Sequence, residues 1–136
     1  MRPRINSGDE PPFHQLDEYL FQKLCRDLFF AEPGITSAIV YGARGERQLG
    51  IDVRAQRYHP TAMEVGQCKR YEHFSPTEIR TASDEFLAHW DYWQTQSVRR
   101  FVLFVTADVS SRRHIAVIDA ERERFRTIGV VYEVWS

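Results

Sequence analysis

The chain has 136 residues, 43% of them hydrophobic and 13% aromatic, which suffices for the core of one globular domain. A formal net charge of −1 excludes the uniformly basic surface of an indiscriminate nucleic-acid binder. The longest apolar run, Phe101 to Val105, is far short of the roughly 20 residues of a membrane span. The two cysteines lack the spacing of a zinc site or disulfide framework, and we expect a cytoplasmic protein without membrane contact.

The N-terminal part of the sequence predicts a flexible lead followed by a helix. Residues 1–12 are polar and contain three prolines, so we place the domain itself at residues 13–136. Apolar residues at helical spacing predict an amphipathic helix from about His14 to Phe30, ended by Pro33-Gly34. The residues at this spacing are Phe13, Leu16, Leu20, Leu24 and Leu28.

Three strands are predicted after this helix. The first is Ile35–Tyr41, the second runs from about Ile51 to Arg57, and the third includes Glu64–Tyr71. A turn near His59-Pro60 joins the second strand to the third. Their pairing would bring Asp52 close to the end of the third strand.

The sequence Ser-Pro-Thr-Glu at 75–78 predicts the start of a second helix. Ser75 is a good N-cap, proline suits the first helical position, and the glutamate completes a capping box. We expect this helix to continue to about Thr95. Its inward face would carry Ile79, Ala82, Ser83, Phe86, Trp90 and Trp93.

The remaining elements are a strand, a helix and a strand. Arg100–Thr106 has the apolar character of a strand covered on both faces, and Val130–Trp135 is the last strand. The helix between them runs from about Ser110 to Arg126, with Gly129 as its stop. Its expected inward residues are Ile115, Ile118 and Phe125. This order implies a right-handed crossover with parallel pairing, and the whole chain reads αβββαβαβ, an α/β fold with helices packed on a mixed sheet.

Asp52, Gln67 and Lys69 are the residues most suggestive of chemistry. Side chains alternate along a strand, so Gln67 and Lys69 project from one face and Glu64 from the other. With Asp52 nearby, the trio could hold a divalent cation beside a scissile phosphate. Taken alone, the three residues are better explained as a turn cap, an edge-strand amide and a solvated lysine.

The neighbouring motifs give the trio a context. The element order, Gly50-Ile51-Asp52, the run Gln67-Cys68-Lys69-Arg70-Tyr71 and the Ser-Pro capped helix together resemble the PD-(D/E)xK nuclease superfamily. A glutamine in place of the second acid resembles its Mrr-like restriction endonuclease branch. The resemblance implies a restriction-endonuclease-like mixed sheet and an endonuclease that hydrolyses DNA with Mg²⁺, or with Mn²⁺.

The resemblance also implies a role for each residue of the trio. Asp52 would be the metal-binding acid, with the Gln67 side-chain oxygen and the Cys68 backbone carbonyl as further metal ligands. Lys69 would orient or help to deprotonate the attacking water, or stabilise the negative charge of the transition state.

The first helix departs from the family pattern. Mrr-like members place a glutamate after a phenylalanine there, whereas this chain has Phe21-Gln22. Gln22 could hold a water of the cation by hydrogen bonding, or Glu18, one helical turn earlier, could supply the missing charge. We expect one-metal chemistry, weak cation affinity in the absence of DNA, or reliance on the substrate phosphate as a ligand.

Partners are also implied by the resemblance. Arg44 and Arg47 in the polar segment 42–50, together with Arg70, are candidates for contacts with the DNA backbone. Similar domains stand at the N-terminus of prokaryotic antiphage defence proteins, before a signalling NTPase, and cutting two strands favours a homo-oligomer. Two alternatives stay open: a nuclease-like module that binds nucleic acid or protein without cutting, and a nuclease for RNA or branched DNA.

Overall fold

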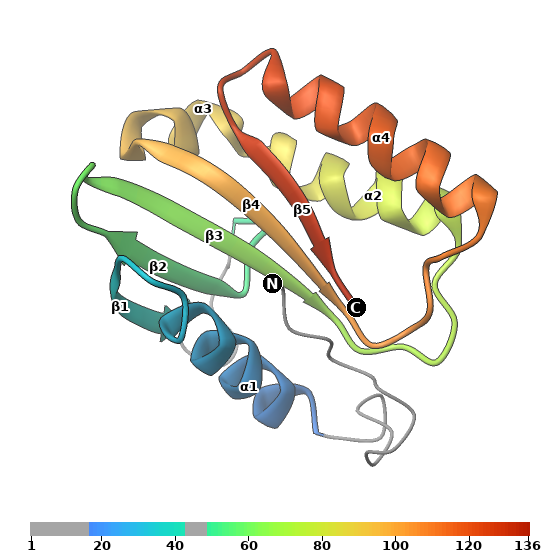
Figure 1. Ribbon diagram of the computed structural model, residues 1–136, viewed down its shortest axis with the longest axis horizontal. Helices are drawn as coiled ribbons and strands as arrows, with labels where there is room; N and C mark the ends of the chain where they lie inside the picture. Colours follow the sequence, from blue (N-terminus) through green and yellow to red (C-terminus); the bar gives the residue numbers. More distant parts are fainter. Residues whose placement is uncertain (1–16, 43–48) are drawn as a thin grey trace.

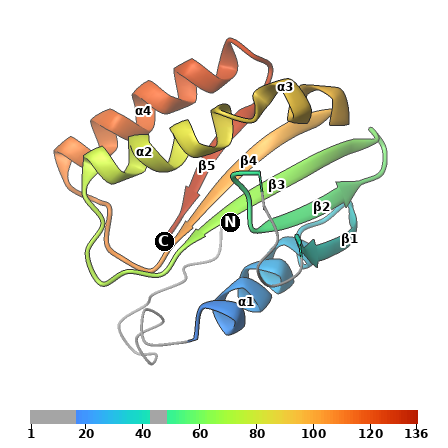
Figure 2. The ribbon, with the colours of Figure 1, turned by 180° about the vertical axis from the view of Figure 1, so that it is seen from behind.

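The computed structural model of the chain describes residues 17–42 and 49–136 (Figure 1). Five strands form one sheet in the order β1-β2-β3-β4-β5, with helices on both faces (Figures 1 and 2). The elements are α1 (Glu18–Phe30), β1 (Ile35–Val40), β2 (Val53–Arg57), β3 (Ala62–Lys69), α2 (Pro76–Leu87), α3 (Trp90–Trp93), the short 3-10 helix η2 (Gln94–Gln96), β4 (Val98–Val105), α4 (Arg112–Arg126) and β5 (Val131–Trp135). Among the described residues, no helix is long and apolar enough to span a membrane.

The sheet is mixed, as the sequence predicts. Strands β1, β2 and β3 pair antiparallel, while β3, β4 and β5 pair parallel. Helix α2 lies in the connection between β3 and β4, and α4 lies in the connection between β4 and β5. The predicted parallel pairing of the last two strands is therefore confirmed, and so is the α/β class with helices flanking a mixed sheet.

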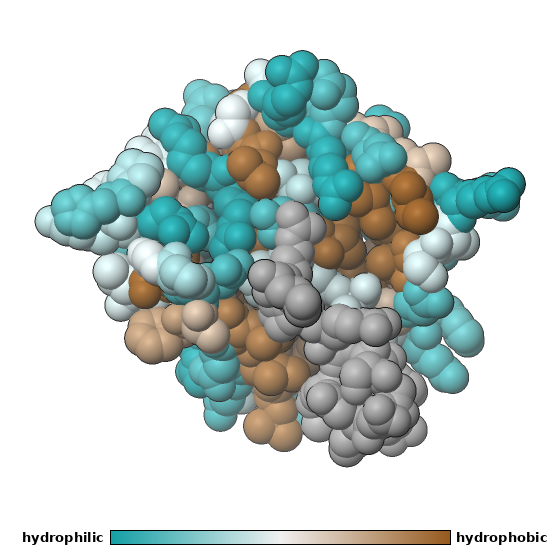
Figure 3. All heavy atoms as spheres, in the orientation of Figure 1, coloured by the Kyte–Doolittle hydropathy of each residue, from teal (hydrophilic) through white to brown (hydrophobic). Residues whose placement is uncertain are grey.

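Two apolar cores lie on the two faces of the sheet. Helix α1 covers one face and packs Phe29 against Phe104 and Trp135. Helices α2, α3 and α4 cover the other, where Phe86 and Phe125 stack in the interior. The burial of each of these aromatic side chains stabilises the fold by about 2–3 kcal/mol. Figure 3 shows hydrophilic side chains along the upper and lateral edges of this face and hydrophobic ones near its lower edge. Exposed hydrophobic residues include Leu20 and Phe30 of α1 and Ile115 of α4.

Helix α1 begins at Glu18, later than the predicted His14. The carboxylate of Asp17 accepts hydrogen bonds from the backbone N–H groups of Tyr19 and Leu20, so it caps the helix at that point. The predicted lead at residues 1–12 lies outside the described residues.

The residues that α1 buries lie one position later in the sequence than the predicted apolar series. Leu20 is 52% exposed, Leu24 and Leu28 are half-buried, and the residues at full burial are Phe21, Cys25 and Phe29. Both sets repeat every four residues, and the larger aromatic side chains take the position facing the sheet. Phe13 and Leu16 lie outside the described residues.

The long second helix was predicted as one element, but it is two. Helix α2 ends at Leu87, and the backbone of His89 departs from helical angles before α3 begins. This break lets the buried Trp93 donate its indole N–H to the carbonyl of Leu49 at 2.8 Å. On α4, Ile118 and Phe125 are buried as predicted, whereas Ile115 is 48% exposed.

Candidate active site

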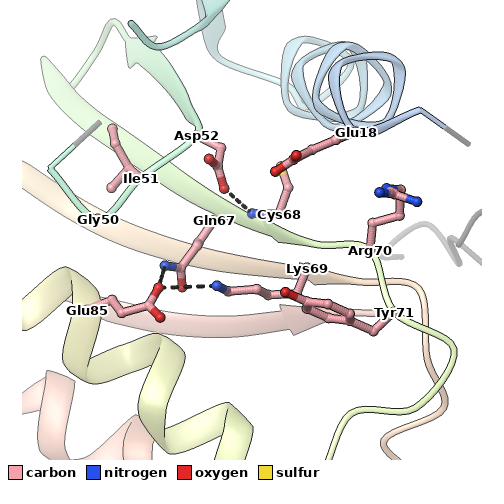
Figure 4. A pocket seen from close by; sticks show the side chains of 10 residues that line it. All are labelled: Glu18, Gly50, Ile51, Asp52, Gln67, Cys68, Lys69, Arg70, Tyr71 and Glu85. Carbon is pink, nitrogen blue, oxygen red and sulfur yellow. Dashed lines mark hydrogen bonds and ion pairs between the residues drawn. The ribbon is translucent and has the colours of Figure 1, made fainter. Parts of the chain in front are cut away.

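A pocket of about 370 Å³ opens where β2 begins and β3 ends. The ten residues labelled in Figure 4 line it, and they come from α1, the loop before β2, β3 and its continuation, and α2. Asp52, Gln67 and Lys69 are among them. The structure therefore brings the trio singled out from the sequence into one cavity.

Asp52 stands one residue before β2 and extends the β2–β3 pairing. Its backbone N–H donates to the carbonyl of Gly66 at 2.8 Å, which places Asp52 opposite Gln67. Its Oδ2 accepts the backbone N–H of Cys68 at 2.7 Å, and its Oδ1 accepts the side-chain N–H of Gln22 at 3.3 Å. The carboxylate is thus oriented by both β3 and α1.

Burial raises the pKa of Asp52 to about 6. The backbone N–H of Cys68 and the positive charge of Lys69 act in the opposite direction, and the negative charges of Glu18 and Glu85 raise the pKa further. A carboxylate that is hard to ionise next to two other acids is a group that a cation would stabilise.

Gln67 and Lys69 both contact Glu85 of α2. The Glu85 Oε2 accepts from the Gln67 amide nitrogen at 2.6 Å and from the Lys69 Nζ at 3.2 Å (Figure 4). Because a carboxylate only accepts, the Gln67 amide must turn its nitrogen to Glu85. Its Oε1 is buried and has no hydrogen-bond partner in the described part of the chain.

The backbone carbonyl of Cys68 faces the same region as Asp52. The backbone N–H of Thr106, just after β4, donates to the carbonyl of Lys69 at 3.3 Å, so Lys69 turns its carbonyl toward β4. Carbonyls alternate sides along a strand, and that of Cys68 therefore points toward β2, whose ladder ends at Asp52. An oxygen donor from the main chain is available beside the carboxylate.

The other expected site residues have varied positions. Gln22 donates to the carboxylate described above, and Glu18 and Arg70 line the pocket. Arg44 and Arg47 lie outside the described residues. Among the residues that the structure describes, no group of three or more His, Cys, Asp or Glu side chains is arranged to hold a metal ion. A cation here would depend on amide and carbonyl oxygens as well.

Glu85 is the residue that sequence reasoning missed. It follows the predicted N-cap by ten positions and precedes Phe86, so it lies beside the inward face of its helix. Its position next to the apolar Phe86 is the one sign in the sequence that Glu85 lies near the sheet. That position does not indicate which strand residues the carboxylate would contact.

No family model, curated protein or solved structure matches this chain. The chemistry of the pocket therefore rests on its own geometry.

Proposed function

We propose that this domain is a metal-dependent endonuclease that hydrolyses DNA phosphodiester bonds, with a fold of the restriction-endonuclease-like, Mrr-like kind. One observation carries the proposal: Asp52, from the start of β2, lines a single pocket together with Gln67 and Lys69 of β3. A carboxylate, a further oxygen donor and an amine are the groups that metal-assisted hydrolysis of a phosphodiester needs.

The oxygen atoms in the pocket fit a hard divalent cation such as Mg²⁺ or Mn²⁺. Asp52 offers a carboxylate, Cys68 a backbone carbonyl, and Gln67 a buried Oε1 that lacks a hydrogen-bond partner within the described residues. When bound, the cation would supply Lewis-acid activation of water and offset the charge of the scissile phosphate.

The side chains of the pocket have distinct tasks in this proposal. Asp52 is ionised above about pH 6 and is held in orientation by Gln22. Lys69 donates its N–H groups to the phosphate oxygens as negative charge develops on them. Arg70, at the edge of the pocket, contacts the DNA backbone beyond the scissile bond.

A second candidate is a module that binds nucleic acid or protein without cutting. The contact of Glu85 with Lys69 favours it, because an ion pair at 3.2 Å offsets the positive charge that a reacting phosphate would need. A nuclease acting on RNA or branched DNA uses the same groups, and the substrate tested separates it.

The wider setting is also proposed from the resemblance. The domain would be the cytoplasmic effector of an antiphage defence protein, act as a homo-oligomer, and be followed by NTPase and sensor domains. Two copies are needed because each pocket cuts one strand.

A plasmid-cleavage assay with Mg²⁺ or Mn²⁺ at high protein concentration tests the proposal. We expect Asp52→Asn and Lys69→Ala each to lower nicking by about 100-fold to 10,000-fold. Lys23→Ala, which removes the other lysine of the chain from the surface of α1, should leave it unchanged.

Nicking that persists in both pocket variants would exclude this site. DNA binding without any cleavage by the parent would support the second candidate, and cleavage confined to RNA or to a four-way junction would change the substrate.

A further inference from the structure

We propose that Glu85 is the second acid of this site and acts through the amide of Gln67 as a positioning residue. This role rests on the proposed function and adds to it a residue from α2, outside the strands that carry the trio. The glutamine and the glutamate together would take the place of a single strand carboxylate.

The hydrogen bond between the two side chains is the first reason. Gln67 is 4% exposed, and its amide N–H donates to Glu85 at 2.6 Å. The contact fixes which way the amide points and leaves its buried Oε1 without a hydrogen-bond partner among the described residues, in a side chain that lines the same pocket as Asp52. A carboxylate that accepts from a metal-ligating side chain orients that ligand and makes its donor atom more basic.

The charge balance of the pocket is the second reason. Three acidic side chains, Glu18, Asp52 and Glu85, line it together with two basic ones, Lys69 and Arg70. Removing either Glu18 or Glu85 would leave two side chains of each sign, so what distinguishes Glu85 is its place beside Gln67 and Lys69. Glu85 also forms the ion pair with Lys69, so it offsets the charge that would otherwise repel the cation.

A backbone contact is the third reason. Gly50 has a φ of +80°, and a Cβ there would lie 2.5 Å from the Glu85 carbonyl oxygen and 2.8 Å from the Phe86 Cα. The loop that leads to Asp52 therefore sits directly on the main chain of Glu85. This close approach, possible only for glycine, fixes the two acids relative to each other.

Glu18 provides a matched comparison within the same pocket. It lines the cavity and raises the pKa of Asp52 through its charge. Unlike the carboxylate of Glu85, that of Glu18 makes no hydrogen bond or ion pair with another residue of the described ranges 17–42 and 49–136. Removing its charge tests electrostatics alone, whereas removing that of Glu85 tests electrostatics and the orientation of Gln67 together.

Mn²⁺ binding to the whole chain, followed by electron paramagnetic resonance of the free ion at pH 7.5, tests this role without depending on cleavage. We expect Glu85→Gln to weaken binding by about 10-fold to 100-fold. Glu18→Gln should weaken it by less than about fivefold, because its exposed carboxylate contacts none of the proposed ligands. The double variant Gln67→Glu with Glu85→Gln moves the charge to the strand and should restore affinity to within about fivefold of the parent.

The outcomes separate this role from the proposed function. If Glu85→Gln behaves like Glu18→Gln while Asp52→Asn loses Mn²⁺, the role of Glu85 is wrong and the cation site stands. Failure of the double variant to recover would also count against it, and recovery excludes a mere folding defect in Glu85→Gln. If the parent binds no Mn²⁺ with or without DNA, or Asp52→Asn binds as the parent does, the proposed function itself fails.

Discussion

Two polar clusters lie along β3, and they differ in how completely their charges are paired. One is the pocket around Asp52. The other, which we call the Glu64 cluster, lies on the α1 side of the sheet and consists of Glu32, Arg57, Glu64, Arg100 and Glu133. The buried carboxylate of Glu64 accepts from Arg57 at 2.5 Å and from Arg100 at 2.6 Å.

The difference separates a fully paired cluster from the candidate active site. In the Glu64 cluster each arginine meets a carboxylate, and the hydrogen bond to Glu64 raises the pKa of Arg57 above its ordinary value. In the pocket, burial keeps the Asp52 carboxyl hard to ionise and the Gln67 oxygen lacks a partner among the described residues. Incomplete satisfaction of buried polar groups lowers stability and is typical of sites that bind something.

The largest effect on stability should come from the paired cluster. Glu64→Gln keeps the shape of the side chain but leaves Arg57 and Arg100 facing a neutral amide. We expect a loss of about 3–5 kcal/mol in the free energy of unfolding, measured by urea denaturation. Mn²⁺ affinity of the folded protein should not change. A loss below about 1 kcal/mol would show that the pairing contributes little.

Gly50→Ala should affect both stability and the pocket. The new Cβ would meet the backbone of Glu85 and Phe86, and alanine disfavours the positive φ of this residue. We expect a loss of about 2–4 kcal/mol in the free energy of unfolding, together with weaker Mn²⁺ binding. Unchanged Mn²⁺ affinity in this variant would mean that the contact does not set the relative position of Asp52 and Glu85.

In contrast to these two variants, Asp52→Asn should increase the free energy of unfolding. The folded-state pKa of Asp52 is raised, so the folded protein binds the proton more tightly than the unfolded chain, and stability falls as pH rises from about 4 to about 6. Asparagine does not ionise, so the variant does not lose stability in this pH range. Allowing for partial exposure, we expect the variant to be more stable than the parent by up to about 2 kcal/mol at pH 7.5.

The same difference should nearly disappear near pH 3, below the ordinary pKa of 3.8, where the parent carboxyl is mostly protonated in both the folded and the unfolded state. Urea denaturation of both proteins at the two pH values checks this. An advantage of the variant that is the same at both pH values would show that it does not arise from ionisation of Asp52.

The smallest effect on stability should come from a glutamate-to-glutamine substitution in an exposed ion pair. Glu123 pairs with Arg126 on the exposed side of α4, and this pair is fully solvated. Glu123→Gln should leave the urea midpoint unchanged within error. A shift as large as that of Glu64→Gln would indicate a general effect of charge rather than of burial.

The sequence predicted the parts of the site that depend on local geometry. Strand alternation and the turn at His59-Pro60 suffice to place Gln67 and Lys69 on one side and Asp52 beside them. Glu85 could not be predicted, because its contacts depend on how α2 packs on the sheet. For the same reason, periodicity did not distinguish the face of α1 that carries Leu20 from the one that carries Phe21.

The contact between Gln67 and Glu85 links the site to the folding of the chain. Glu85 lies on α2, inside the crossover that joins the parallel strands β3 and β4. Two parallel strands cannot be joined by a tight turn. Glu85 therefore meets Gln67 only after this long-range connection has formed. A nascent or partly folded chain that has only the β2–β3 hairpin would carry Asp52, Gln67 and Lys69 without Glu85, so the cation affinity that we propose would arise only once the domain is complete.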